Sequence, residues 1–361
     1  MNSNINVQLV RVISLILVVF YHLQIEFFSF GYIGVDIFFL ISGYLMPLMI
    51  SKYSPYEFIK RRTVRLYPAL SFVVSCAIVI GYFVSMPGEY LATGESGALS
   101  LVFLSNLYFY FNTGYFDIDA SLQPLLHTWS LGNEYFAYVI LFFMLLANST
   151  KKLILGSVLV CFLSLIYILN RFPDIDYLDP IPRLFLFFIA FIYSFYFREK
   201  KSNSLLSIII SVCALTFMFS MYKQELLSSL WPNNSIFLLP FVILPLLSMD
   251  KVIISNFRLQ YLIDLIGRWS YSIYLWHWLV ISYEFSYMRN SSITGVTELM
   301  LLLTLSLFGG IFSFYLIERQ TKLTKYTTVF SVVGCLLIII NSGYEGRVDK
   351  EVIPYTRLDK M

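Results

Sequence analysis

Three histidines occur in the chain, and each stands in an otherwise aromatic or apolar segment. They are His22, His127 and His277. An imidazole with an unperturbed pKa near 6.5 can take up and release a proton close to neutral pH. These three side chains are therefore the first candidates for acid–base chemistry.

Arg11 and His22 are predicted to share one face of the first helix. They are eleven residues apart, and eleven helical steps of about 100° return to within about 20° of the starting direction, with roughly 16 Å of rise. Ionisable groups inside a membrane are costly and usually mark a pathway or a site. The alternative is that Arg11 reaches the inner headgroups while His22 lies at the outer interface.

Asp36 lies at the outer end of the second predicted span, in the segment GYIGVDIFFLISGYLM. If the first two helices pack as an antiparallel pair, its carboxylate can orient or charge-stabilise His22, which makes Asp36 a catalytic candidate. An equal interpretation is an acid at a helix start, favoured by the helix dipole.

The segment PLLHTWSLGNEYFAY places His127, Ser130 and Glu134 at positions i, i+3 and i+7, which is one face of a helix. A histidine, a hydroxyl and a carboxylate that converge near the outer surface can hold a polyol substrate. The alternative is that Thr128 and Ser130 cap the helix while Glu134 interacts with its dipole. The local order does not support a Ser-His-Glu triad.

A basic cluster occupies the segment FIKRRTVRLYPAL, which is predicted to be a cytoplasmic loop. Guanidinium groups bind phosphate in a bidentate manner, so Arg61, Arg62 and Arg65 are candidates for holding a phosphorylated donor. The alternative is the positive-inside signal with contact to anionic lipids, and for the pattern RRxxR alone this is the preferred interpretation.

A late segment, GRWSYSIYLWHWLV, places Ser270, Tyr274 and His277 on one helical face, with Trp276 and Trp278 beside the histidine. The alternative role for such a histidine is a hydrogen-bonded structural one.

Glu318, in the segment FYLIERQ, is predicted to pair with an arginine of the basic cluster, or else with its neighbour Arg319 on the surface. No Walker loop, HExxH or GxSxG motif is present, which argues against an ATP-driven pump. Four singly spaced cysteines predict neither disulfides nor a metal site.

The elements that must position these side chains are predicted to be membrane-spanning helices. Hydrophobic residues make up 58% of the chain and charged residues 13%, whereas soluble proteins have roughly 45–50% and about 25%. The apolar residues form stretches long enough to cross a bilayer core of about 30 Å. The fold class is therefore all-α, a polytopic bundle of about 10–11 spans. The expected spans are 7–26, 32–50, 68–86, 128–147, 153–170, 181–197, 205–222, 235–250, 269–287, 297–317 and 327–342.

The basic residues gather in alternate breaks between these spans, and the segment 87–127 contains no Lys or Arg. The positive-inside rule therefore predicts a cytoplasmic N-terminus and an external loop over 87–127, in which 97–111 is a short buried or re-entrant piece. Residues 1–342 are expected to form one transmembrane domain, followed by a short external tail at 343–361. A net charge of +3 gives no reason to expect nucleic-acid binding.

In their order along the chain, the motifs GVDIFFLISGYLM, FIKRRTVRLYPAL, HTWSLGNEYF, GRWSYSIYLWHW and YLIER, with Arg11 and His22 before them, resemble the membrane acyltransferase family (acyltransferase type 3). The resemblance is strongest to bacterial O-antigen and polysaccharide O-acetyltransferases. It implies that His22 is the essential histidine and that Arg11, Arg62, Arg65 and Glu318 serve the donor. It assigns the acceptor side to a set of late and middle residues, namely His127, Trp129, Ser130, Tyr274 and His277.

Some positions depart from the family pattern. Asn133 and Phe136 stand where the family usually has an aliphatic residue and a Gln, Val64 where some relatives carry an extra Arg, and Gln320 where a Pro is usual. Many relatives also continue into an external hydrolase-like domain. This sequence ends about nineteen residues after its last predicted span. The protein is expected to act alone, to use a separate periplasmic partner, or to be a truncated gene product.

The resemblance implies a multi-pass enzyme of the bacterial inner membrane, in contact with membrane lipids. It would move an acetyl group from cytoplasmic acetyl-CoA to a hydroxyl of a glycan or lipid-linked oligosaccharide, such as O-antigen lipopolysaccharide or capsule. No permanently bound cofactor or metal is expected. His22 acts either as the general base or as the acyl carrier. The competing functions are a glycan transporter or flippase and a non-catalytic subunit for polysaccharide export.

Overall fold

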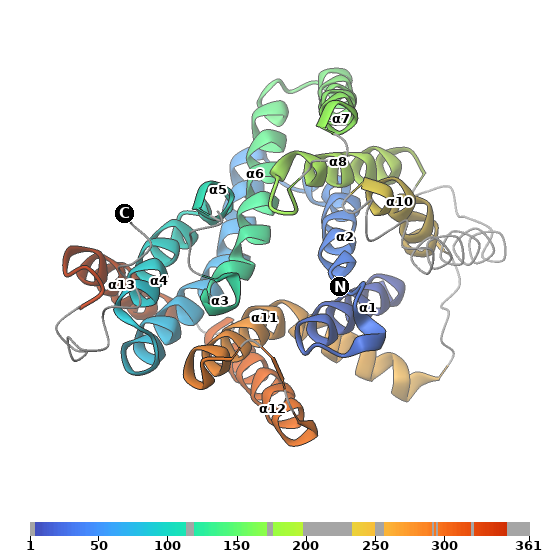
Figure 1. Ribbon diagram of the computed structural model, residues 1–361. Helices are drawn as coiled ribbons and strands as arrows, with labels where there is room; N and C mark the ends of the chain where they lie inside the picture. Colours follow the sequence, from blue (N-terminus) through green and yellow to red (C-terminus); the bar gives the residue numbers. More distant parts are fainter. Residues whose placement is uncertain are drawn as a thin grey trace. The chain divides into compact units, whose positions relative to one another are not determined.

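The computed structural model describes residues 4–112, 119–171, 176–197, 233–249, 256–290, 292–293, 295–318 and 321–344. Every regular element in these ranges is a helix (Figure 1), so the protein is an all-α polytopic bundle. The chain divides into two compact units, which are described separately. The first unit comprises residues 1–21, 27–61 and 133–270, and the second comprises 22–26, 62–132 and 271–361.

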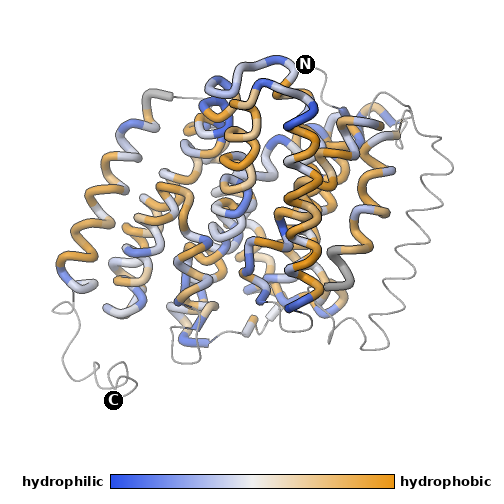
Figure 2. The backbone as a smooth tube through the Cα atoms, turned by 90° about the horizontal axis from the view of Figure 1, so that it is seen from above, coloured by the Kyte–Doolittle hydropathy of each residue, from blue (hydrophilic) through white to orange (hydrophobic). Residues whose placement is uncertain are grey.

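Eight helical segments among the described residues are long and apolar enough to cross a membrane. Apolar residues run along most of their length in Figure 2. Each of the eight overlaps a predicted span. They are α1 (Ile5–His22), α2 (Ile33–Ile50), α3 (Pro55–Val84), η3 with α6 (Leu126–Leu146), α7 (Thr150–Arg171), α8 (Pro180–Phe197), α12 with η4 (Val296–Glu318) and α13, which is Thr321–Ile340 as a helix and Leu323–Ile340 as a span.

The other predicted spans have different outcomes. The segment 235–250 corresponds to α10 (Asn233–Leu247), and 269–287 lies inside the longer α11 (Phe257–Met288). The prediction for 205–222 lies outside the described residues, as does most of the tail at 343–361.

The basic cluster lies in a helix, so the prediction of a loop was wrong. α3 begins at Pro55, thirteen residues before the predicted start of the third span, and contains Arg61, Arg62 and Arg65 in its first three turns. Lys, Arg and Leu are good helix formers. Pro68 lies in the interior of α3 without ending it, as is often seen in membrane helices, where neighbouring groups satisfy the freed backbone carbonyl.

The predicted external loop at 87–127 is also largely helical. It contains α4 (Pro87–Leu101), α5 (Ser105–Asn112) and the short 3-10 turns η2 (Ala120–Leu122) and η3 (Leu126–Thr128). The predicted buried piece at 97–111 is split between α4 and α5 by a break at 102–104, where Phe103 has a positive φ of 59°. α4 packs against α13 within the second unit.

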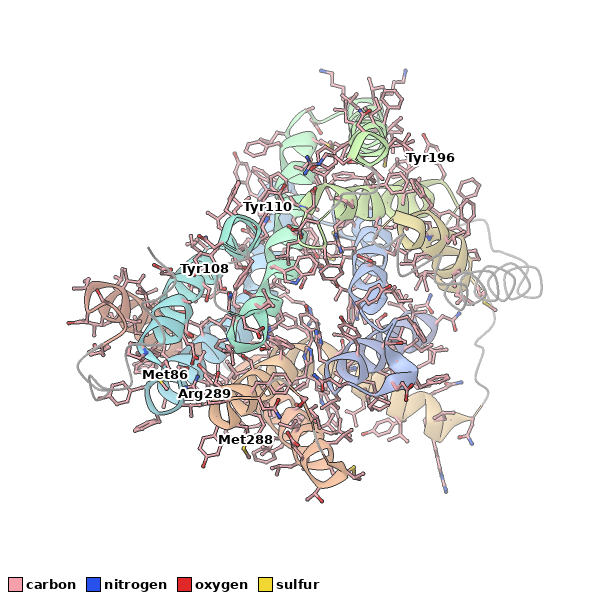
Figure 3. The ribbon with its side chains drawn as sticks, in the orientation of Figure 1. Met86, Tyr108, Tyr110, Tyr196, Met288 and Arg289 are labelled. Carbon is pink, nitrogen blue, oxygen red and sulfur yellow. The ribbon has the colours of Figure 1, made fainter. Side chains whose placement is uncertain are left out.

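Glu89 fixes the start of α4 through contacts at both of its carboxylate oxygens. One oxygen accepts a hydrogen bond of 2.9 Å from the backbone N–H of Met86, and the other forms an ion pair with Arg289, which follows α11 (Figure 3). Figure 3 shows Met86 and Arg289 close to each other, as their shared contact with Glu89 requires. This ion pair links α4 to the end of α11 inside the second unit.

The centre of the first unit is the packing of α2 on α8. Gly43 of α2 faces the backbone carbonyl of Phe187 in α8 so closely that a Cβ at this position would overlap it. A glycine is therefore required at this crossing because only it lets the two backbones approach.

The predicted orientation can be tested by thiol labelling. In a background in which the four native cysteines are replaced by serine, Asn112→Cys at the exposed end of α5 should react with a membrane-impermeant maleimide added to intact spheroplasts. Lys52→Cys, also exposed, should react only after permeabilisation. Reversal of this pattern would place the N-terminus outside.

Candidate active site

The three histidines lie together in the second unit. Nδ1 of His22, the last residue of α1, is 3.1 Å from Nε2 of His277 in α11, and the two ring centroids are 5.2 Å apart. The ring of His127 lies 6.1 Å from that of His277. We call His22, His127 and His277, together with Tyr274, the histidine cluster.

His277 is held by its own helix. Its Nδ1 contacts the backbone carbonyl oxygen of Tyr274, three residues earlier in α11, and its side chain is completely buried. His22, in contrast, is half-buried. His22 is therefore the more accessible of the two histidines, and a substrate can reach it.

Tyr274 ties the turn around His127 to α11. Its hydroxyl donates to the backbone carbonyl of His127 at 3.1 Å and lies 2.8 Å from the hydroxyl of Ser130, which itself donates to the same carbonyl at 3.1 Å. All three residues are buried. The structure therefore joins Ser130, Tyr274 and His127 in one hydrogen-bonded group.

The indole of Trp278 packs against His22. The ring centroids are 4.6 Å apart, and the indole N–H donates to the backbone carbonyl of Gln123 at 2.9 Å. Trp278 and Gln123 are both buried. Trp278 therefore braces one side of the His22 ring, a contact that its position beside His277 in the sequence could suggest but not establish.

The remaining acceptor-side prediction is Trp129, which is the first residue of α6 (Trp129–Leu146) and is buried in the second unit. His127 belongs to η3, which leads directly into α6, so His127, Ser130 and Glu134 lie in one helical segment, Leu126–Leu146. His127 and Ser130 belong to the second unit and Glu134 to the first.

Glu134 has partners of its own in the first unit. Its carboxylate accepts hydrogen bonds from the hydroxyls of Ser42 in α2 and Tyr138 in α6. Two hydroxyl donors hold this carboxylate in place. The arrangement gives Glu134 a positional role between α2 and α6 within the first unit.

Asp36 contacts an arginine that the sequence analysis missed. Its Oδ1 lies 3.2 Å from Nε of Arg183 in α8, and both side chains are fully buried. The guanidinium group also stacks over the ring of Tyr177 at 4.7 Å and donates to the carbonyl of Asp179 at 3.3 Å. Arg183 is therefore the charged partner of Asp36 inside the first unit. The orientation of His22 by Asp36 stays a prediction.

Glu318 lies at the end of a π-helical turn, η4 (Phe314–Glu318). Its carboxylate accepts a hydrogen bond from the hydroxyl of Ser272 in α11, and the charge of Arg65 in α3 attracts it. Both contacts fall within the second unit, and π-helical turns are frequent at functional sites. The pairing of Glu318 with an arginine of the basic cluster stays a prediction, and Arg319 lies outside the described residues.

The other predicted donor residues are distributed over both units. Arg62 shares the second unit with Arg65, whereas Arg11 and Arg61 belong to the first. Arg61 forms an exposed ion pair of 2.8 Å with Glu57 and lies over the ring of Tyr53 at 4.1 Å. Arg11 donates to the side-chain oxygen of Gln8 at 3.3 Å.

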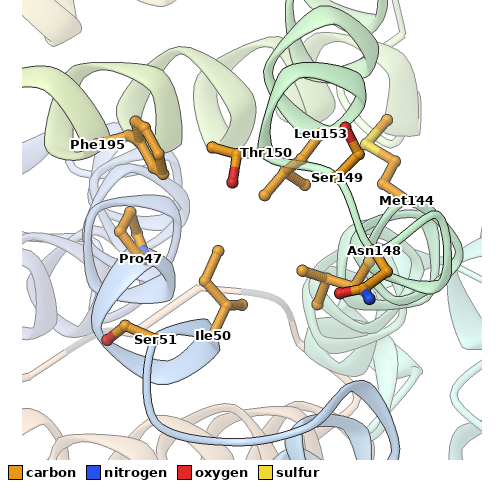
Figure 4. A pocket seen from close by; sticks show the side chains of 10 residues that line it. Pro47, Ile50, Ser51, Met144, Asn148, Ser149, Thr150, Leu153 and Phe195 are labelled. Atoms are coloured by element: carbon orange, nitrogen blue, oxygen red, sulfur yellow. The ribbon is translucent and has the colours of Figure 1, made fainter.

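A separate cavity of about 350 Å³ opens in the first unit, where α2, α6, α7 and α8 provide its walls (Figure 4). Its lining combines apolar side chains such as Phe195 with the polar groups of Ser51, Asn148 and Thr150. No charged side chain is among the described residues that line it. The described lining therefore offers a phosphate group no charged partner.

Comparison with known proteins identifies the class of enzyme. Residues 4–340 match the family model for the acyltransferase domain. The chain therefore belongs to this family and is a multi-pass membrane acyltransferase.

Among its relatives is BcsY of Komagataeibacter xylinus, named a membrane-bound transacylase, which is 28% identical over 86% of this chain and 80% of its own length. The O-acetyltransferase OatA of Staphylococcus aureus is 27% identical over 86% of this chain and 56% of its own. The peptidoglycan O-acetyltransferase OatA of Listeria monocytogenes is 28% identical over 75% and 48%. The chain thus spans about half of each OatA. No solved structure gives a significant match.

Proposed function

We propose that the protein transfers an acetyl group from acetyl-CoA to a hydroxyl group of a cell-surface polysaccharide. The observation that carries the proposal is the contact between half-buried His22 and buried His277 inside the histidine cluster. It places an imidazole, a side chain that can act as a general base, in a membrane acyltransferase. The names of the OatA relatives favour O-acetylation, and one of them includes peptidoglycan. We include O-antigen and capsule among the proposed glycan acceptors.

The chemistry assigned to His22 is general-base catalysis. Its imidazole takes the proton from the acceptor hydroxyl while the hydroxyl oxygen attacks the thioester carbonyl carbon. The tetrahedral intermediate collapses, the carbon–sulfur bond breaks, and the thiolate of CoA leaves and takes up the proton. The products are an O-acetyl ester and free CoA. Direct transfer is preferred to an acyl-histidine intermediate because it needs one acyl transfer and not two.

The donor is assigned to the cytoplasmic side of the bacterial inner membrane. Arg62 and Arg65 supply guanidinium groups suited to the phosphates of CoA. Ser272, which binds Glu318 near Arg65, precedes His277 in α11 by five residues, or about 7.5 Å of helical rise. A donor anchored near Arg65 therefore needs only a short reach along α11 to bring its thioester towards the histidine cluster.

The acceptor is assigned to the surface formed by His127, Trp129 and the hydroxyls of Ser130 and Tyr274. These groups lie in the same unit as His22, and their hydrogen-bonding atoms and aromatic faces suit a polyol. The acceptor is a glycan or a lipid-linked oligosaccharide at the outer face of the membrane, and a separate periplasmic protein that carries the acetyl group onward is compatible with this arrangement.

The test is acetyl transfer in vesicles that contain the purified protein, radiolabelled acetyl-CoA on one side and an oligosaccharide acceptor on the other. Ester-linked label on the glycan, released by mild alkali, is the expected result. Movement of unmodified glycan across the membrane without any transfer of label would favour a transporter.

Arg62→Ala and Arg65→Ala are each expected to raise the KM for acetyl-CoA with a smaller effect on kcat. A charge-assisted phosphate contact is made in both the ground state and the transition state, and its loss costs about 1.5–3 kcal/mol. This energy corresponds to about a tenfold or larger rise in KM. Steady-state kinetics in the vesicle assay measure the change.

Lys52→Ala is the matched control because this residue is basic and exposed but precedes α3. It should leave the KM unchanged. An unchanged KM in both arginine variants, with normal insertion into the membrane, would assign the basic cluster to topology alone.

A further inference from the structure

The contacts around His277 determine which of its ring nitrogens carries a proton. A backbone carbonyl can only accept a hydrogen bond. The carbonyl of Tyr274 is in contact with Nδ1 of His277, so Nδ1 must carry the hydrogen. A neutral imidazole has a single ring proton, and Nε2 of His277 therefore presents a lone pair.

This lone pair faces His22. Nε2 of His277 and Nδ1 of His22 are 3.1 Å apart, a normal hydrogen-bond distance. Because Nε2 of His277 can only accept, Nδ1 of His22 must donate. Neutral His22 then carries its proton on Nδ1, and its lone pair lies on Nε2.

We propose that His277 is a positioning residue that fixes His22 in the Nδ1–H tautomer and so makes Nε2 of His22 the atom that removes the proton from the acceptor hydroxyl. This inference rests on the proposed function. His277 touches neither donor nor acceptor in this scheme. It acts through His22, as the partner of a catalytic histidine commonly does.

The same hydrogen bond also serves the step in which His22 becomes charged. After Nε2 of His22 takes the proton, the imidazolium still donates from Nδ1 to His277, and a charge-assisted hydrogen bond is stronger than a neutral one. The packing of Trp278 at 4.6 Å holds the His22 ring in the orientation that this bond requires. The hydrogen bond to His277 therefore orients the His22 ring both before and after proton transfer.

The presence of three histidines in the whole chain makes the tautomer directly measurable. Protein labelled with ¹⁵N-histidine gives six ring-nitrogen signals, and single variants assign them. In the wild type, His22 is expected to show a protonated Nδ1 and an unprotonated Nε2. In His277→Leu, which offers no acceptor, His22 should become a mixture of tautomers and the transfer rate should fall by about 100-fold.

His277→Gln is the conservative variant, because its side-chain oxygen can lie where Nε2 was and accept from His22. It should retain the Nδ1–H tautomer and a transfer rate within about tenfold of wild type. Ser282→Ala, at a buried position later in α11, is the control for repacking and should change neither readout.

A wild-type His22 with its proton on Nε2 would overturn the inference, and so would an unchanged His22 tautomer in His277→Leu whatever its rate. If His277→Leu does not fold, a loss of the Nδ1–H tautomer in His277→Gln would overturn it equally. Failure of the proposed function gives a different result, namely no acetyl transfer by the wild type, and it leaves the tautomer measurement to stand by itself.

Discussion

Replacement of His22 by glutamine should abolish acetyl transfer. Glutamine keeps a hydrogen-bonding side chain of similar size but cannot take up a proton near neutral pH. General-base catalysis typically contributes a factor of about 10²–10⁴, so the remaining rate should fall below the background of a vesicle assay. His22→Ala should be equally inactive, because neither variant provides a base. The wild-type rate should also fall on acidification, since a protonated imidazole cannot accept another proton.

The other two histidines provide matched controls within the same cluster. His127→Gln and His277→Gln should retain partial activity if these residues position or pack, as their buried locations indicate. Binding of CoA to His22→Gln should persist, because the arginines assigned to the donor are unchanged. Near wild-type transfer by His22→Gln would show that the imidazole is structural, and the transporter and export-subunit functions would then be preferred.

The same variant separates the two chemical routes. Wild-type protein incubated with radiolabelled acetyl-CoA but no acceptor should remain unlabelled if His22 is a general base. Label on the wild type that is absent from His22→Gln would instead identify His22 as an acyl carrier.

The sequence predicted the fold class and most of the spans because length and apolar content determine whether a helix can cross a membrane. It did not predict that most of 87–112 is helical, because this segment contains serine and glycine, which favour turns in soluble proteins. In α4 the hydroxyls of Thr93, Ser96 and Ser100 each donate to the carbonyl four residues earlier. Such bonds satisfy the polar side chains inside a helix. The packing of α4 against α13 stabilises the helix further.

The candidate site was predictable residue by residue but not as an arrangement. Residue spacing shows which side chains share a helical face, and it correctly grouped Tyr274 with His277. It cannot show which helices are neighbours, and His22 and His277 are 255 positions apart. The hydrogen bond that joins them therefore depends on tertiary packing, for which a single sequence carries no local signal.

Arg183 was overlooked although the sequence contains a usable signal for it. It is the charged residue within an otherwise uncharged apolar span at 181–197, and a charge in such a span needs a partner. Asp36 has the same property in the span 32–50. Each is the fourth residue of its helix, in α8 and α2, and both helices are predicted to start at the outer face. The two charges therefore lie at matching depth, which allows them to pair.

Removal of either partner of this buried pair is expected to destabilise the protein strongly. Asp36→Leu leaves an unpaired buried guanidinium group, and Arg183→Leu leaves an unpaired buried carboxylate. An uncompensated buried charge of this kind costs about 3–5 kcal/mol. The melting temperature of the detergent-solubilised protein, followed by size-exclusion chromatography after heating, should fall by several degrees in each single variant.

The double variant Asp36→Leu/Arg183→Leu should recover much of the loss, because it leaves no buried charge behind. The control pair is Asp264 and Arg268, which also forms an ion pair in the first unit but with half of the arginine side chain exposed. Arg268→Leu should cost less than about 1 kcal/mol. Additive losses in the double variant would contradict the pairing of Asp36 with Arg183. Recovered stability without recovered acetyl transfer would show that the pair also serves catalysis, since the fold would then be intact and the reaction still lost.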